Sequence, residues 1–210
     1  MKALLTIMGG SLVLLAGCSK TPEAPSPVGP PAPLSAEVRS AAAQRGQAIV
    51  TETFSLLSSN LQSAIQQGGV SNALPYCSLA ASPLTVGIAV KHGVTLRRVT
   101  LKARNRADKA DAVEAAILNQ FAAVLANTTN PPPPLVTNLT ANRATFFAPI
   151  VLNNTLCLKC HGEPGQDLSA ENVAVIQRLY PQDEATGFKL GDLRGAWRID
   201  FPLATLSAGP

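Results

Sequence analysis

A run of five residues, CLKCH from Cys157 to His161, limits what this chain can be more than any other stretch. In a helix Cys157 and Cys160 lie three residues apart on one face, and His161 lies one turn beyond Cys157 on the same face. Two thiols at this spacing can form thioether bonds to haem vinyl groups while the imidazole reaches the iron, so C-x-x-C-H is the attachment signature of a c-type haem. Half of a zinc site or a redox dithiol are the alternatives, and zinc would need a second ligand pair that the sequence lacks. The motif predicts one covalent haem c.

The N-terminus predicts export. Lys2 precedes an apolar run from Ala3 to Ala16 that is too short for a comfortable membrane span, and small residues follow it. Leu-Ala-Gly-Cys, ending at Cys18, resembles the bacterial lipobox, in which the cysteine is acylated; an ordinary signal peptide with an incidental Cys18 is the alternative. Ser19 in place of Asp favours the outer membrane over the inner. We therefore expect a periplasm-facing lipoprotein of the cell envelope, the compartment in which c-type haem is attached.

Three segments follow from this interpretation. Residues 1–17 are the signal peptide, residues 18–34 are a tether with six prolines, and residues 35–205 are the haem c domain. Only 14% of the residues are charged, and no cluster of lysine and arginine is interleaved with aromatics, so the net charge of +4 does not predict nucleic-acid binding. The expected attachments are a membrane, through lipid on Cys18, and a redox partner protein that the sequence does not identify.

The helical patterns lie mostly in the first half of the chain. Ser35 is the expected N-cap of a long helix that ends at Gly68-Gly69. Residues 71–92 contain Pro75 and Pro83, which predicts two short helices with Cys77 near a kink. Asp108 or Asp111 should cap a helix over residues 112–126, and residues 170–179 predict a short one. The expected buried stripe of the 112–126 helix is Val113, Ile117, Phe121 and Val124.

Strand patterns lie mostly in the second half. Alternation of apolar and polar residues predicts strands at 94–101, 135–139, 145–151 and 196–201. Helices first and strands later indicate the α+β class, a small antiparallel sheet with helices packed against it.

The second axial ligand of the iron is the main question that the residues leave open. The only methionines, Met1 and Met8, belong to the predicted signal peptide, which excludes His/Met ligation. Cys77, His92 and an open or lysine-bound site remain. Cys77 is the one cysteine with no other assignment, although a buried inert thiol is a common alternative. His92 precedes Gly93 at an expected helix end, where an imidazole commonly caps carbonyls.

Three stretches together resemble a known family. They are VTLKARN (residues 99–105), CLKCHG (157–162), and Tyr180-Pro181 followed by KLGDLRGAW (189–197). The chain resembles, over residues 36 to 203, the single-haem c-type cytochrome domain of unknown function known from a cyanobacterial cytochrome, and haem domains of bacterial sensors. The resemblance implies a PAS-like fold around one covalent haem, with His161 and Cys77 as the axial ligands. Arg106 departs from the family, which more often has proline there.

Other residues are weaker candidates for the haem site. Lys102, Arg104 and Arg194 could pair with haem propionates, because a guanidinium binds a carboxylate in bidentate fashion; each could equally be a solvated surface charge. Asn105 is expected to fix its loop. The aromatic residues Phe147, Tyr180 and Trp197 pack either on the haem or in the core, and the core is expected for Trp197.

These observations predict a lipid-anchored monohaem cytochrome that transfers one electron at low potential. The alternative is a redox or gas sensor in which a ligand displaces Cys77. A haem enzyme such as a peroxidase is not expected, because it needs an open distal site with a general base, and only His92 would be left for that role.

Overall fold

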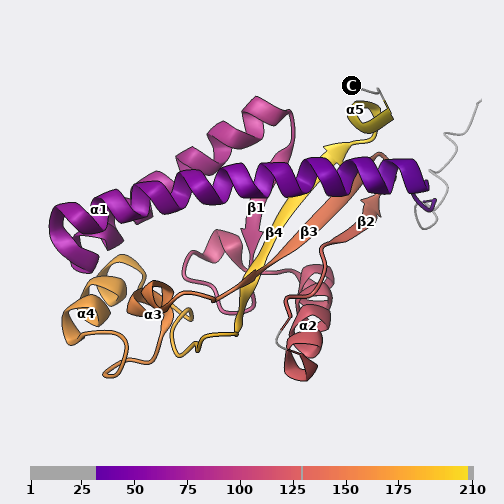
Figure 1. Ribbon diagram of the computed structural model, residues 1–210. Coiled ribbons are helices and arrows are strands. Elements are labelled where there is room, and N and C mark those ends of the chain that lie inside the picture. Colours follow the sequence, from indigo (N-terminus) through magenta and orange to yellow (C-terminus); the bar gives the residue numbers. More distant parts are fainter. Residues whose placement is uncertain (1–31, 129, 208–210) are drawn as a thin grey trace, which may run out of the picture.

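The computed structural model describes residues 32–128 and 130–207 (Figure 1). The predicted signal peptide, Cys18 and most of the predicted tether lie outside the described residues. The elements are α1 (Ala36–His92), β1 (Thr95–Val99), a 3-10 turn η1 (Arg106–Asp108), α2 (Ala112–Asn127), β2 (Leu135–Thr140), β3 (Arg143–Val151), α3 (Thr155–His161), α4 (Ala170–Leu179), β4 (Leu193–Pro202) and α5 (Ala204–Ser207). The α+β class is confirmed: the four strands form one antiparallel sheet in the order β1-β4-β3-β2.

The element α1 is a hairpin of two helical arms (Figure 1). The predicted stop is confirmed, since Gly68 and Gly69 have non-helical backbone angles and Gly69 has a φ of 72°, a conformation that glycine adopts without a Cβ clash. We call residues 36–67 the first arm and residues 70–92 the second arm. Ser35 caps the first arm as expected. Glu52, in the middle of the first arm, joins the two arms by binding Lys91 (2.6 Å) and His92 (2.7 Å) at the end of the second arm.

The second arm corrects one prediction. It is continuous through Pro75 and Pro83 and is not divided into two short helices. Each proline removes one backbone hydrogen bond, but the arm is held by buried residues before and after this stretch. Leu74 is 5% exposed and Ile88 is 7% exposed. Tertiary burial therefore outweighs the local cost of the two prolines.

The two faces of the sheet are covered by different helices (Figure 1). Side chains alternate along a strand, so Phe146 packs under α1 while Phe147 packs under α2. Both rings are fully buried, and each such burial contributes about 2–3 kcal/mol. Trp197 belongs to the α1-side core, as expected. Gly46 lets the first arm approach closely, because a Cβ there would lie 2.5 Å from Phe146.

The packing of α2 corrects a second prediction. Asp111 caps this helix in a reciprocal capping box with Glu114, whereas Asp108 ends the preceding turn. Val113 is 53% exposed and Val124 is 39% exposed, so the buried stripe is Glu114, Ile117, Leu118 and Phe121. Relative to the prediction, α2 is rotated about its own axis, because the fully buried Glu114 carboxylate binds Arg97 (2.5 Å) and Arg198 (2.7 Å) on the sheet. A hydrophobicity pattern does not reveal that an acidic residue faces inward.

Candidate functional site

The CLKCH motif forms the short helix α3, as its spacing predicted. Asn154 caps it by accepting a hydrogen bond from the Leu156 amide (2.8 Å). A seven-residue helix has little stability of its own, so its position depends on contacts at its C-terminal end.

The last four carbonyls of α3 all accept hydrogen bonds from outside the regular helix pattern or from its cap. One donor is the adjacent cap residue, and the other three come from separate segments of the chain, which hold the helix in place. The hydrogen bonds are Gly162 N to Leu158 O (2.9 Å), Asn172 Nδ2 to Lys159 O (3.4 Å), Arg104 Nη2 to Cys160 O (2.7 Å) and Phe188 N to His161 O (2.9 Å).

The His161 ring is held in a defined orientation. Its Nδ1 lies 2.8 Å from the Ala185 carbonyl, so the Nδ1–H donates there and Nε2 is left as the free nitrogen. Burial lowers the pKa of His161 well below its ordinary value, and the nearby Arg194 and Arg104 lower it further. A neutral imidazole with a free Nε2 is the form that binds a metal.

Arg104 organises the support of this ring. Its guanidinium binds Asp183 (3.0 Å) and also reaches the Cys160 and Ala185 carbonyls. Asp183 in turn accepts a hydrogen bond from the Ala185 amide (3.1 Å). Arg104 was predicted to pair with a propionate. In the structure its Nε and Nη2 instead donate hydrogen bonds that position α3 and His161.

Cys77 lies on the second arm, across from α3. It is half-buried, and burial raises the pKa of its thiol while Arg98 lowers it. Burial also raises the pKa of Cys160 to about 11, and both Cys77 and Cys157 are near enough to contribute. The three cysteines of the described residues therefore gather at one end of the molecule, and all three are free thiols.

His92 does not belong to this cluster. It is fifteen residues from Cys77 along one helix, a separation of about 22 Å at the rise of an α-helix. It is the last residue of the second arm, and its Nε2 lies against Glu52 in the middle of the first arm. The two residues cannot serve the same metal, and the expected structural role of His92 at the helix end fits its position.

Arg194 is a guanidinium near His161 that forms no salt bridge with an acidic side chain of the described residues. Its Nη1 donates to Thr100 Oγ1 (2.8 Å) and to the Lys102 carbonyl (3.1 Å). Its Nε is buried with no hydrogen-bond partner in the part of the chain that the structure describes. Burial lowers the pKa of Arg194 to about 10, although Asp108 and Asp183 partly offset this. Such a group is suited to receive an anion.

Lys102 lies on the same side as Arg194. Its ammonium is 4.5 Å from the centre of the Phe188 ring and donates to the Thr186 carbonyl, while the Arg194 guanidinium lies 5.4 Å from that ring. The Phe188 ring in turn contacts His161 edge to face, with centroids 6.3 Å apart.

Sequence reasoning missed Arg98. It contributes to the pKa of Cys77, His161 and Arg194, and it binds Asp108 (3.4 Å). It shares a face of β1 with the buried Leu96, the face that carries α1. A charged residue at a core-facing position of a strand is the signal that could have identified it.

The loop before α2 agrees with the expectation for Asn105. Its side chain caps η1 by accepting a hydrogen bond from the Ala107 amide (3.0 Å). Arg106 is the first residue of this turn, a position that also tolerates proline. The departure from the family therefore leaves the loop intact.

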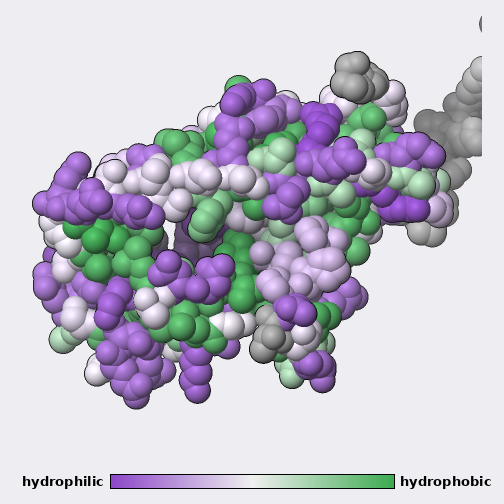
Figure 2. All heavy atoms as spheres, viewed as in Figure 1, coloured by the Kyte–Doolittle hydropathy of each residue, from purple (hydrophilic) through white to green (hydrophobic). Residues whose placement is uncertain are grey.

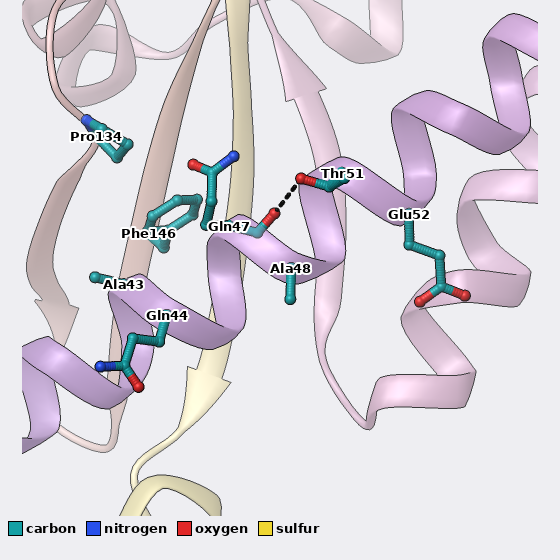
Figure 3. A pocket seen from close by; sticks show the side chains of 8 residues that line it. All are labelled: Ala43, Gln44, Gln47, Ala48, Thr51, Glu52, Pro134 and Phe146. Carbon is teal, nitrogen blue, oxygen red and sulfur yellow. Dashed lines mark hydrogen bonds between the residues drawn. The ribbon is translucent and has the colours of Figure 1, made fainter.

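Two of the hollows on the described part of the molecule are relevant to the position of the site. Figure 2 shows one beneath the first arm, between the end formed by α3 and α4 and the sheet. The other is a groove of about 860 Å³ between the first arm, Pro134 and Phe146 (Figure 3). The groove is lined by no cysteine or histidine, and its one charged residue, Glu52, already binds Lys91 and His92. It is not a site for a metal or a haem.

These features define a class: an α+β domain that presents a cysteine from a helical hairpin and a CxxCH helix at one end of a small antiparallel sheet. The chain belongs to the Tll0287-like family, whose model matches residues 35–202. It is similar to the crystal structure of the cyanobacterial heme-protein Tll0287, with 26% sequence identity and a TM-score of 0.53. The match covers 75% of this chain and 95% of that chain. The comparison with curated proteins found no match.

Proposed function

We propose that this protein binds one haem c, attached through Cys157 and Cys160, and transfers single electrons with it at the cell envelope. His161 and Cys77 are the proposed axial ligands. The observation that carries the proposal is the meeting of a free, half-buried Cys77 with a CxxCH helix whose histidine is neutral and oriented. The similarity to a solved haem protein supports the haem.

The residues at this end fit the group. Two thiols and an imidazole occupy one short helix, and the buried, unpartnered Nε of Arg194 is a donor suited to a propionate. Lys102 is the second propionate candidate. When bound, the haem supplies a one-electron iron couple. The chain supplies the ligand set, and a cysteine thiolate favours the ferric state, so we expect a low midpoint potential.

The Cys77→Ala variant tests this proposal. The ferric wild type should give a low-spin, thiolate-type absorption and EPR spectrum with a strongly negative midpoint potential. Cys77→Ala should become high-spin and its potential should rise, because the electron-donating sulfur is lost. A mass spectrum of the denatured protein should retain one haem in both. Spectra that do not differ would remove Cys77 from the iron.

A sensor is the second candidate. Cys77 lies on a helical arm that starts at a glycine turn, and displacement of this ligand could move the arm. Binding of carbon monoxide at micromolar concentration by the ferrous protein would favour the sensor. Inertness to the gas with fast electron exchange would favour the carrier. We do not propose that the protein is a haem enzyme such as a peroxidase. Substantial turnover of peroxide by the purified protein would contradict this proposal.

A further inference from the structure

The stretch of α1 that carries Cys77 is weakly anchored to the sheet. No residue from Pro75 to Leu84 is buried, so this stretch is held mainly through what precedes and follows it. On the C-terminal side, Ile88 and Ala89 pack into the sheet core. On the N-terminal side, the anchor is not the sheet but α4.

The contact between α4 and the second arm is both apolar and polar. Leu74, three residues before Cys77, packs in one cluster with Leu168 and Ile176, and Cys160 of the haem motif lies against this cluster. The side chain of Asn172 is the polar centre: its Oδ1 accepts a hydrogen bond from Ser71 Oγ (3.0 Å), and its Nδ2 donates to the Lys159 carbonyl (3.4 Å). Asn172 is 6% exposed.

Asn172 therefore touches both sides of the proposed haem site. Ser71 belongs to the arm that carries Cys77, and Lys159 lies between the two cysteines of the CxxCH motif. The carbonyl of Lys159 is one of the last four of α3, which have no partner in the regular helix pattern, and the Asn172 amide supplies that partner.

The other end of α4 also meets the arm. Tyr180 is the C-cap of α4, and its hydroxyl has a pKa that burial raises and that Arg104 and Ser78 partly lower. Ser78 is the residue next to Cys77. The cap of α4 therefore lies near the second arm on the other side of Cys77 from Ser71.

We propose that Asn172 is a positioning residue that links the Cys77 arm to the haem-binding helix and sets how readily an external ligand displaces Cys77. The proposal rests on the proposed ligation by Cys77 and deepens it. Without the Asn172 contacts the arm keeps its hairpin and its sheet anchor, but the stretch around Cys77 loses its polar link to α3.

The test is a titration of the ferric holoprotein with imidazole, which competes with Cys77 for the iron. Asn172→Ala should lower the apparent Kd about tenfold, the effect expected from losing hydrogen bonds with a net contribution of about 1.4 kcal/mol. Ser71→Ala removes one of the two contacts and should lower the apparent Kd by about threefold. If Asn172→Ala fails to fold, the Ser71→Ala variant alone tests the proposal.

Asn60→Ala is the matched control. Asn60 also makes two hydrogen bonds, from Tyr76 (2.9 Å) and to the Leu56 carbonyl (2.8 Å), but both stay within the hairpin. Equal apparent Kd values for the Asn172 and Asn60 variants would overturn the proposal, since general loosening of α1 would then explain both. If the wild type shows no thiolate-type spectrum and Cys77→Ala is indistinguishable from it, ligation by Cys77 fails, and this inference fails with it.

Discussion

At the scale of single residues, the charge near Cys77 is the most informative feature. Burial raises the pKa of the Cys77 thiol, which opposes the thiolate that an iron ligand needs, and Arg98 acts in the opposite direction. Arg98 is itself held by Asp108 on the neighbouring turn. The site thus contains a cation that favours the charged form of the proposed sulfur ligand.

Replacement of Arg98 by Leu should make the thiolate easier to protonate. Without the cation the pKa of Cys77 is higher, so the low-spin ferric spectrum should be lost at a higher pH as the solution is acidified, by about one pH unit. An acid titration followed by absorbance measures the midpoint. Arg106→Leu, which removes an exposed arginine from the adjacent loop, is the control and should not move it. An unchanged midpoint in Arg98→Leu would show that Arg98 does not influence the protonation of Cys77.

At the scale of elements, α1 shows which features of a helix are determined by its local sequence and which by tertiary packing. The glycine pair ends the first arm as its sequence predicts, because Gly69 adopts a left-handed conformation. The two prolines of the second arm do not break it, because burial on the sheet and on α4 holds both ends of that stretch. The glycine pair therefore determines the turn by itself, whereas tertiary contacts outweigh the effect of the two prolines.

Two glycines of α1 provide a direct comparison. Gly69→Ala should lower the free energy of unfolding by about 1 kcal/mol, because alanine disfavours a φ of 72°. Gly87→Ala should raise it by up to about 1 kcal/mol, because Gly87 is helical, exposed and has open space where a Cβ would stand. Urea unfolding of the two variants measures both changes. Changes of the same sign would contradict the assignment of Gly69 as the turn residue.

At the scale of the whole molecule, the proposed haem lies at one end, on α3 and the hairpin, while the described chain begins at the other end, beside α5 and the far end of the first arm (Figure 1). The described chain therefore enters the domain at the end that is remote from α3. We expect membrane attachment and haem properties to be separable.

Cys18→Ala should separate them. If Cys18 is acylated, cells expressing the variant should release most of the protein from the membrane fraction, because a stable anchor needs at least two acyl chains or signals. The absorption spectrum and midpoint potential should equal those of the wild type. Fractionation with labelled palmitate measures both the lipid and the release. Retention of an unlabelled wild-type protein in the membrane would contradict the lipid anchor.

The features that were predictable are those encoded within a few residues. The spacing in CLKCH, the caps at Ser35 and Asp111, the Gly68-Gly69 stop and the alternation of the strands each depend on local backbone geometry. The structure agrees with all of them. Cys77 was singled out by counting cysteines and by family resemblance, and the structure brings it to the same end as the motif.

The remaining features depend on contacts between segments far apart in the chain. Three examples join residues separated by tens of positions. Glu114 faces inward to Arg198, Arg98 lies near enough to Cys77 to lower its pKa, and Asn172 bonds to Ser71. A buried polar group is stable only when its partners arrive from elsewhere in the fold, so its own neighbours in sequence carry no sign of it. The local sequence therefore specified the haem motif, and the tertiary structure specified what holds and tunes it.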